Sequence, residues 1–502
     1  MENKYNLGDA VALALSNGST WATKERMDAA IKRLGITWKG MDDLIMNRRI
    51  IYYDNDGSDL FTLPACQRAE HSLAENLMRI RNAKPAFPIP SDEKIQEYLD
   101  QAAKETGVKL CDEQAEAVAM AAKTQVLIVT GGPGTGKTST LKSIEYVLRK
   151  IGYTSIAYTA PTGKAARRIS ESTGQPASTL HKKIKITKDN LNPTKIEEQV
   201  VIVDEVSMLD LQVSEAFFRA VPSGTKVILV GDTDQLPSVG NGSVLRDMIR
   251  SEVVPVAYLI KTFRQGAESL IISNMKNVRD GICDLRNGDD FHLMSPNKIY
   301  SAVDEMLAVY MSEYERLGGN DDLVLLTPFR KRTKETSSEA LNDKLQAMIN
   351  PTGKYCRDEK NNLIFRIGDP VMQMENRAEC ANGDVGRIID AGKNGIVVQY
   401  IDGQVQYTKT ELSDGQLSLA YAMSIHKSQG SEYKSVITCL LNEHGPMLQR
   451  NLLYTAVTRA KKNCFLVCEP DAVKKAIETV ADSNRVTLLA EMLRVHALLA
   501  YV

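Results

Sequence analysis

The stretch Gly131-Gly132-Pro133-Gly134-Thr135-Gly136-Lys137-Thr138 decides the fold of this chain. It follows an apolar run at residues 125–129, which predicts a buried strand, and it precedes residues 141–149, where apolar side chains recur at helical spacing. Glycines let backbone N–H groups converge on phosphate oxygens, and the following helix presents its positive N-terminal end to the same anion. This strand–loop–helix context predicts a nucleoside triphosphate site, where Lys137 reaches the β- and γ-phosphates and Thr138 offers its hydroxyl to Mg²⁺.

The bulk composition bounds the class of protein. A chain of 502 residues exceeds what one hydrophobic core supports and suggests about three or four domains. Its composition, 43% hydrophobic and 25% charged, is ordinary for a globular protein, and the net charge of −1 gives no overall basic field. No apolar run reaches membrane-spanning length, and the eight cysteines lack zinc-site spacing. We expect a cytoplasmic protein with reduced cysteines and no membrane partner.

From about residue 110 onward, apolar strand patterns alternate with helical patterns. This alternation predicts a parallel sheet with helices on both faces, followed by a second, weaker block of the same kind. A Gly- and Val-rich stretch at residues 383–412 interrupts the second block and predicts a small β-barrel. The expected strands lie at residues 126–129, 156–158, 200–203, 227–230, 323–326, 435–441 and 464–468.

The first eighty or so residues follow a different pattern. Short helical patterns come first, and then two apolar runs at residues 50–53 and 60–63 flank Asp54-Asn55-Asp56-Gly57, which predicts a hairpin. This order suggests a small winged-helix-like module. Pro85, Pro88 and Pro90 then mark a linker.

Polar residues at the ends of the predicted strands indicate which reaction takes place at the triphosphate site. Val200-Val201-Ile202-Val203-Asp204-Glu205 is an apolar strand that ends in two carboxylates. We expect Asp204 to hold Mg²⁺ and Glu205 to orient or deprotonate the attacking water, which favours hydrolysis over transfer. Gln235 follows the next strand, where its amide can contact the γ-phosphate. Gln114, before an amphipathic helix, can read the adenine edge.

Two arginines complete the predicted catalytic set. Arg264 lies just after the first sheet and Arg459 lies in the second block. An arginine delivered from a second domain neutralises transition-state charge and makes hydrolysis depend on domain closure. Taken alone, an arginine more often forms an ion pair at the surface. The presence of the whole set of predicted catalytic residues favours a catalytic role for both arginines.

In the same order, these residues resemble the motifs of superfamily 1 DNA helicases of the RecD-like, 5′→3′ branch. Ala160-Pro161-Thr162-Gly163-Lys164-Ala165-Ala166, Thr179-Leu180-His181 and Ala422-Met423-Ser424-Ile425-His426-Lys427-Ser428-Gln429-Gly430-Ser431-Glu432 carry the likeness beyond the nucleotide motifs. The resemblance implies two RecA-like domains with ATP between them and single-stranded DNA across their tops. It implies that Thr162, Lys164, His181 and His426 contact DNA, and that Glu432 holds the ribose. The nucleotide-binding set is then Gln114, Gly131, Gly132, Pro133, Gly134, Thr135, Gly136, Lys137, Thr138, Ser139, Gly430 and Glu432.

The resemblance also assigns the domains. We expect an N-terminal helical, winged-helix-like module at residues 1–84 and a linker with a lead-in helix at 85–108. A first RecA-like domain at 109–295 contains a hairpin insertion at about 182–198, in the place where the family carries a strand-separating pin. A second RecA-like domain at 296–502 contains the small β-barrel insertion at about 345–418. The fold class is therefore α/β, with helices on both faces of two parallel sheets.

The predicted function is an ATP-dependent DNA helicase, bacterial or phage-encoded, that uses ATP and Mg²⁺. It would translocate 5′→3′ on single-stranded DNA, act at junctions of single and double strands, and serve repair or recombination. One alternative is a DNA-stimulated translocase that remodels nucleoprotein without processive unwinding. Another is a helicase-like subunit that docks a larger complex through the N-terminal module, for which a protein partner is possible. The pathway, and the choice of DNA over RNA, stay open from the sequence.

Overall fold

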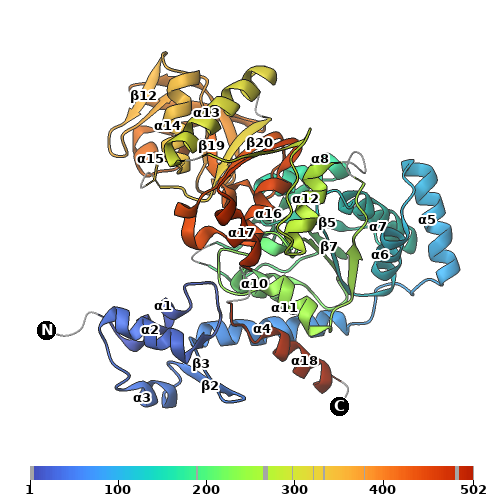
Figure 1. Cartoon of the computed structure of the whole chain (residues 1–502). Helices are drawn as coiled ribbons and strands as arrows, with labels where there is room; N and C mark the ends of the chain where they lie inside the picture. The colour runs from blue at the N-terminus through green and yellow to red at the C-terminus, as the bar shows by residue number, and fades with distance from the viewer. Residues whose placement is uncertain are drawn as a thin grey trace.

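The computed structural model describes residues 5–187, 190–263, 269–296, 298–319, 322–331, 334–377, 379–480 and 485–500. Figure 1 shows a small N-terminal module at one end of the molecule and a β-rich insertion at the other, with two helix-covered sheets between them. Among the described residues, no helix combines the length and apolar character that a membrane span requires.

The first sheet is built from the apolar runs that surround the glycine-rich loop. Its six strands pair in the order β6-β5-β7-β8-β4-β9, and every pairing is parallel. The central strands are buried on both faces, which explains why their sequences are continuously apolar instead of alternating. In chain order the strands are β4 (Val126–Gly131), β5 (Ile156–Ala160), β6 (Ala177–Thr179), β7 (Val200–Val203), β8 (Lys226–Gly231) and β9 (Val256–Leu259).

This strand order sets the place of the site. β7, β8 and β4 are adjacent and parallel, so their carboxyl ends meet at one edge of the sheet. Gly131 ends β4, Asp204 follows β7 and Asp232 follows β8, which brings the three predicted nucleotide motifs side by side. The helices of this domain are α6 (Asp112–Lys123), α7 (Lys137–Ile151), α8 (Gly163–Thr173), α9 (Leu180–Ile184), α10 (Leu211–Ala220) and α11 (Val244–Ser251).

The second sheet is also parallel, with strand order β10-β21-β20-β11-β19. Together with the first sheet it confirms the predicted fold class. Its strands are β10 (Phe291–Met294), β11 (Leu323–Thr327), β19 (Ala422–Ser424), β20 (Tyr433–Leu440) and β21 (Ala460–Cys468). The helices are α12 (Leu270–Arg279), α13 (Ile299–Arg316), α14 (Ser338–Ile349), α16 (Arg450–Thr458) and α17 (Pro470–Glu478).

The border between the two sheets differs from the expected one at residues 295 and 296. β10 pairs with β21, and Ile271 and Met275 of α12 pack in the same hydrophobic cluster as Phe291, so both elements belong to the second sheet. A four-residue strand has too little periodicity to reveal which sheet it joins. The second domain therefore begins before residue 291.

The insertion in the second domain is an antiparallel sheet with its own core. Its strands pair in the order β17-β16-β15-β14-β18, beside a separate hairpin of β12 and β13. Phe365, Val398 and Tyr407 are fully buried within it. The elements are β12 (Tyr355–Asp358), β13 (Leu363–Arg366), β14 (Pro370–Gln373), β15 (Val385–Gly392), β16 (Gly395–Tyr400), β17 (Gly403–Thr408), α15 (Lys409–Ser413) and β18 (Leu417–Leu419).

The N-terminal module consists of three short helices and a three-stranded sheet of order β1-β3-β2. The sheet contains the expected hairpin, turned at Asp56 and Gly57, and adds β1, whose two residues are too few to give a sequence pattern. Its elements are α1 (Leu7–Ala14), β1 (Ala22–Thr23), α2 (Lys24–Leu34), α3 (Met41–Met46), β2 (Ile51–Asn55) and β3 (Ser58–Thr62). Two further helices, α4 (Pro64–Arg81) and α5 (Asp92–Thr106), lead into the first sheet.

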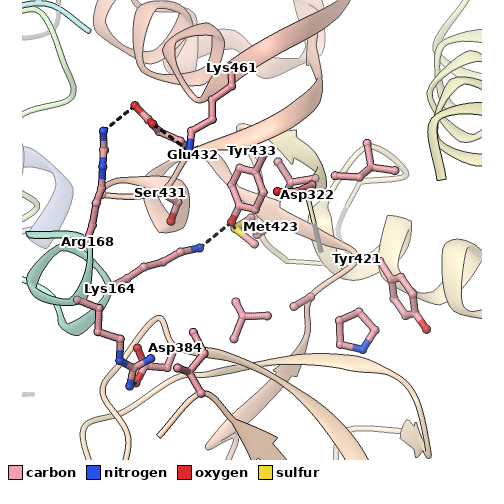
Figure 2. A pocket seen from close by; sticks show the side chains of 18 of the residues that line it. Lys164, Arg168, Asp322, Asp384, Tyr421, Met423, Ser431, Glu432, Tyr433 and Lys461 are labelled. Atoms are coloured by element: carbon pink, nitrogen blue, oxygen red, sulfur yellow. Dashed lines mark hydrogen bonds and ion pairs between the residues drawn. The ribbon is translucent and has the colours of Figure 1, made fainter. Parts of the chain in front are cut away.

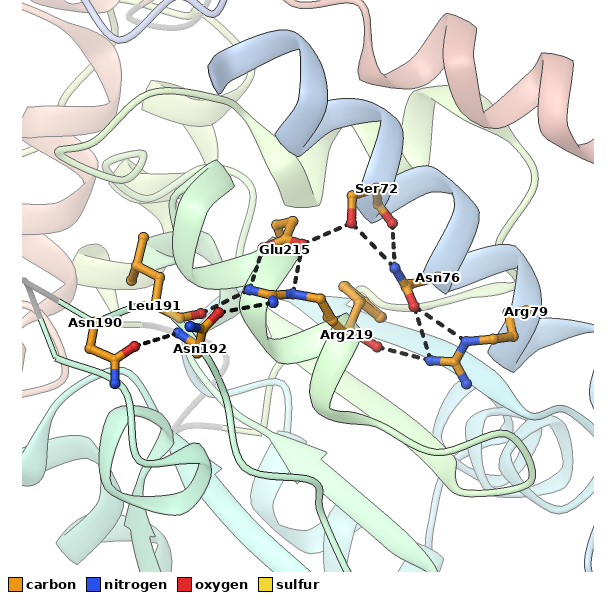
Figure 3. Close-up of polar contacts among 9 residues, drawn as sticks. Ser72, Asn76, Arg79, Asn190, Leu191, Asn192, Glu215 and Arg219 are labelled. Atoms are coloured by element: carbon orange, nitrogen blue, oxygen red, sulfur yellow. Dashed lines mark hydrogen bonds and ion pairs between the residues drawn. The ribbon is translucent and has the colours of Figure 1, made fainter. Parts of the chain in front are cut away.

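Helix α4 attaches the N-terminal module to the first domain through α10, as Figure 3 shows. Ser72 donates a hydrogen bond of 2.8 Å to Glu215, and Glu215 pairs with Arg219 at 3.0 Å. Arg219 in turn donates to the carbonyl of Leu191 at 2.8 Å. The last described helix, α18 (Leu489–Leu499), returns from the second domain and packs against α4 and α11, so the module is held from two sides.

The segment expected to form a hairpin at about 182–198 doubles back on itself. Thr187 and Asn190 exchange backbone hydrogen bonds of 2.9 and 3.3 Å, and Thr194 donates to the carbonyl of Ile184 at 2.8 Å. The segment begins with the last turn of α9, and none of its described residues forms a regular strand. Its role as a pin stays a prediction.

Candidate functional site

The glycine-rich loop leads directly from β4 into α7, which begins at Lys137. Gly134 and Gly136 have φ angles of 78° and 79°, a left-handed conformation that favours glycine. A Cβ at Gly136 would lie 2.2 Å from the amide nitrogen of Gln114, so a larger residue there would have to displace the Gln114 side chain. The loop therefore keeps its backbone N–H groups at the positive end of α7, which is the geometry that binds phosphate.

Lys137 and Gln114 stabilise this loop from two sides. The Lys137 ammonium donates to the carbonyls of Gly131 at 2.6 Å and Gly132 at 2.9 Å. Gln114 is buried, donates to the carbonyl of Thr135 at 3.1 Å and accepts from the backbone of Cys111 at 3.1 Å. The oxygen and the nitrogen of the Gln114 amide are thus both hydrogen-bonded to backbone groups. Recognition of the adenine base by Gln114 stays a prediction.

Asp204 and Glu205 lie directly after β7. Glu205 adopts a left-handed backbone with φ 54° and ψ 39°, which costs a non-glycine residue about 1 kcal/mol or more and is a feature of functional sites. Its N–H donates to the Asp204 carboxylate at 2.8 Å. Burial, followed by the like charge of Glu205, raises the pKa of Asp204 to about 6, although Lys137 acts in the opposite direction.

This raised pKa bears on the predicted metal. A buried carboxylate whose charge is incompletely compensated gains from a nearby cation. The oxygen donors expected there, the Asp204 carboxylate and the Thr138 hydroxyl at the start of α7, are the kind that Mg²⁺ prefers. The residues present therefore fit a magnesium ion.

The second domain reaches the glycine-rich loop through α16 and the residue after it. The Tyr454 hydroxyl lies so near the loop that a Cβ at Gly132 would be 2.9 Å from it, and it donates to Asp232 at 3.2 Å. Arg459 is buried and donates to the carbonyls of Thr455 at 3.0 Å and Ser431 at 3.1 Å. Burial lowers the pKa of Arg459, and the negative charge of Glu205 opposes that shift. The charge of Glu205 in the first domain thus acts on Arg459 in the second. Arg264, the other predicted arginine, lies outside the described residues.

Gln235 lies in the segment after β8, between the two domains. Its side chain is buried and donates to Asp232 at 3.3 Å, while its amide oxygen has no hydrogen-bond partner among the described residues. Asn451 donates to the Gln235 carbonyl at 3.1 Å, and Thr455 accepts from the N–H of Leu236 at 2.8 Å. The segment that the sequence predicts to sense phosphate is therefore bonded directly to the second domain.

A further cavity of 460 Å³ lies between α8, the second sheet and the β-rich insertion. Figure 2 shows side chains that line it. Glu432, expected at the ribose, lines this cavity with Gly430 and pairs with Arg168 at 2.8 Å and Lys461 at 3.5 Å. Burial disfavours the charge of Arg168, but Glu432, Glu205 and Asp204 outweigh burial and raise its pKa. Arg168 thus links the first domain to the second beside the two carboxylates.

Sequence reasoning did not select Arg168. The available signal was its position four residues after Lys164, which places both on one face of α8.

All four residues predicted to contact DNA line one pocket of 310 Å³. Thr162 caps α8 by accepting from the N–H of Ala165 at 3.2 Å, and the Lys164 ammonium donates to the Tyr433 hydroxyl at 3.0 Å. Burial lowers the pKa of both His181 and His426, which favours neutral imidazoles. The pocket also includes Val239, Asn382 and Lys427, so it is formed by the first domain, the second domain and the insertion.

Three family models match parts of the chain. A model described as an AAA domain matches residues 109–291, and one described as a UvrD-like helicase C-terminal domain matches residues 419–467. Residues 341–400 match a model described as the SH3 domain of ATP-dependent RecD-like DNA helicases. The last match falls on the β-rich insertion of the second domain.

Among curated proteins, the chain is 33% identical to an ATP-dependent RecD2 DNA helicase of Deinococcus radiodurans, over 88% of this chain and 59% of that protein. It therefore spans about three fifths of that relative. It is 28% identical to the RecBCD enzyme subunit RecD of Haemophilus influenzae, over 77% of this chain and 72% of that protein. A solved structure of a Bacteroides Pif1 helicase with ADP-AlF3 and single-stranded DNA is 19% identical, with a TM-score of 0.44, and covers 78% of this chain and 94% of that one.

Proposed function

We propose that the chain is an ATP-dependent DNA helicase of the RecD-like family that moves 5′→3′ on single-stranded DNA, a proposal supported by its similarity to the Deinococcus RecD2 helicase and to the SH3-domain model of RecD-like helicases. The observation that carries the proposal is the contact of two RecA-like domains at one glycine-rich loop. Tyr454 of the second domain lies against Gly132 and donates to Asp232 of the first domain at 3.2 Å. A motor of this kind needs a site whose parts lie on two bodies that move relative to each other.

The proposed reaction follows from the places of these side chains. Lys137 would exchange its two carbonyl partners for the β- and γ-phosphates of ATP. Glu205 would orient the attacking water and accept its proton, and Arg459 would neutralise charge on the γ-phosphate. Thr138 and Asp204 would hold Mg²⁺, which neutralises phosphate charge when bound. Arg264 would act as a second phosphate contact.

Hydrolysis would be communicated through the segment after β8. We propose that Gln235 reports the loss of the γ-phosphate, because this segment is bonded to Asn451 and Thr455 of the second domain. A change at the phosphate would then alter the contact between the domains. Repeated opening and closing would carry the strand through the pocket of Thr162, Lys164, His181 and His426.

The single-stranded DNA is proposed to lie across that pocket and to be held mainly through its backbone. Replacing Lys164 by alanine is expected to weaken binding similarly for all sequences, because phosphate contacts carry no sequence information. The slope of log affinity against log salt concentration should become shallower by about 0.7, the value for one phosphate contact on a single strand. Fluorescence anisotropy with labelled oligonucleotides at several salt concentrations measures both quantities.

Lys142→Ala provides the matched control for that measurement, because Lys142 is an exposed lysine on α7 outside the pocket. An unchanged salt slope in the Lys164 variant would place the strand elsewhere.

Unwinding of tailed duplexes tests the proposed function itself. We expect ATP-dependent separation of a duplex with a 5′ single-stranded tail and none with a 3′ tail. Lys137→Ala should slow hydrolysis by about 100- to 1000-fold, as loss of one preorganised donor to a developing charge does, and should stop unwinding. A gel assay with DNA and RNA tails in parallel also decides which nucleic acid is used.

The other outcomes of this assay identify the alternatives. ATP hydrolysis without unwinding from either tail would indicate a translocase that remodels nucleoprotein. Negligible hydrolysis in the presence of single-stranded DNA would indicate a docking subunit. We propose a protein partner for the N-terminal module because the Haemophilus relative is named as a subunit of the RecBCD enzyme. Acting on bacterial or phage DNA, in repair or recombination, would place the chain in the cytoplasm.

A further inference from the structure

Arg485 lies in a short strap, residues 485–488, that leads from the second domain to α18. Its guanidinium donates to three backbone carbonyls of one loop: Ser238 at 2.7 Å, Gly240 at 3.3 Å and Gly242 at 2.8 Å. On its other side lies Gly18 of the N-terminal module, where a Cβ would be 2.4 Å from the guanidinium carbon. Arg485 therefore fills the space between the N-terminal module and the loop at residues 238–242.

This loop joins the two parts of the proposed machinery. It continues directly from Gln235 and Leu236, which lie at the nucleotide side and bond to the second domain. Val239 lines the proposed DNA pocket, and the residue is 85% exposed. One stretch of eight residues, 235–242, thus reaches from the nucleotide site to the DNA pocket.

Arg485 is one of several groups that hold this loop: the Ser238 hydroxyl donates to the carbonyls of Gly240 at 3.1 Å and Gly242 at 3.3 Å, and the N–H of Leu211 donates to the carbonyl of Asn241 at 2.8 Å. Gly240 and Gly242 add backbone freedom, and Gly242 has a φ of 100°. The rigid, forked donor set of arginine is suited to fixing several carbonyls at once, which a lysine ammonium does less well. Gly242 also donates to the carbonyl of Gly18 at 2.8 Å, so the loop and the module are bonded to each other as well as to Arg485.

We propose that Arg485 is a positioning residue that couples DNA occupancy to ATP hydrolysis by holding residues 238–242 in one conformation. The inference rests on the proposed helicase function. While Arg485 holds the loop in place, contact of the DNA strand with Val239 affects Gln235 at the nucleotide site. When Arg485 no longer holds the loop, the nucleotide site and the DNA pocket still form, but binding at one no longer affects the other.

The strap has anchors that do not depend on Arg485. The carbonyl of Val486 accepts from the N–H groups of Thr20 at 3.0 Å and Trp21 at 3.1 Å. The buried carboxylate of Glu70 accepts from the N–H of Leu488 at 3.2 Å. An Arg485→Ala variant should therefore fold with its strap in place and lose the hydrogen bonds from Arg485 to the loop.

The experiment compares ATP turnover with and without a saturating single-stranded oligonucleotide. In Arg485→Ala we expect basal turnover within about twofold of wild type, while stimulation by DNA falls roughly ten- to hundredfold, the range that small misplacements remote from the chemistry produce. Arg485→Lys should show an intermediate loss. Arg494→Ala is the matched control, because Arg494 anchors α18 to the carbonyl of Arg250 without touching the loop.

Stimulation equal to wild type in Arg485→Ala would overturn the inference, whatever happens to the melting temperature. If that variant fails to fold, Arg485→Lys together with hydrogen exchange of residues 238–242 decides the question. Faster exchange with weaker stimulation supports the clamp, and faster exchange with unchanged stimulation refutes it. A wild-type chain without any DNA stimulation would instead refute the proposed function.

Discussion

Replacing Arg459 by alanine is expected to lower DNA-stimulated ATP turnover by about 10³- to 10⁵-fold, the range measured for arginines that neutralise a transferring phosphate. The reason is the position of Arg459 relative to the two domains. Arg459 belongs to the second domain, yet the charge of Glu205 in the first domain acts on it. Its removal should leave the glycine-rich loop intact, so that ATP still binds while the closed state loses the positive charge that Arg459 adds from the second domain.

Steady-state hydrolysis and binding of a fluorescent ATP analogue measure these two effects separately. Lys462→Ala is a suitable control, because Lys462 is an exposed cation three residues away on β21. Since Arg459 is buried and hydrogen-bonded, a melting curve must show that the variant is folded. Turnover within tenfold of wild type would exclude Arg459 from the catalytic set.

Glu205→Gln is expected to slow hydrolysis by about 10²- to 10⁴-fold, the usual contribution of a positioned general base. Glutamine preserves the shape of the side chain and its capacity to hydrogen-bond water, but it cannot accept the proton. The variant should therefore bind ATP normally and accumulate an ATP-bound state. Rapid-quench measurements of a single turnover follow the chemical step directly.

Glu252→Gln provides an unusually close control for that substitution. Glu252 also has a left-handed backbone, with a φ of 59°, but it is exposed at the end of α11. If both glutamine variants lose activity equally, the loss reflects backbone strain rather than chemistry. Normal single-turnover rates in Glu205→Gln would show that another group accepts the proton.

The sequence predicts the two sheets well for a physical reason. Strands buried on both faces must be apolar throughout, so β4, β7 and β8 are visible as continuous runs that end in polar residues. The parallel arrangement then places Gly131, Asp204 and Asp232 together without any knowledge of side-chain packing. Short elements such as β1 and β10 carry too few residues to show a period, and only pairing in three dimensions assigns them.

The side chains that connect the domains are the least predictable part of the site. Arg168 and Arg485 are surface-type residues in sequence, and an arginine most often forms an exposed ion pair. Their partners, Glu432 and the carbonyls of residues 238–242, are more than two hundred residues away in the chain. The position of Arg168 four residues after Lys164 places it on the same face of α8 but does not identify its partner, and no local pattern marks Arg485; the glycine-rich loop, in contrast, carries its whole pattern within eight residues.

The return of α18 to the first domain has a mechanical consequence. The chain passes from the first sheet to the second between β9 and α12, and it passes back between α17 and the strap before α18. Two bodies joined by a single tether can twist freely, but two tethers leave rotation about the line between them as the easy motion. The second crossing, whose described part is residues 485–488, therefore restricts how the two sheets can turn relative to each other.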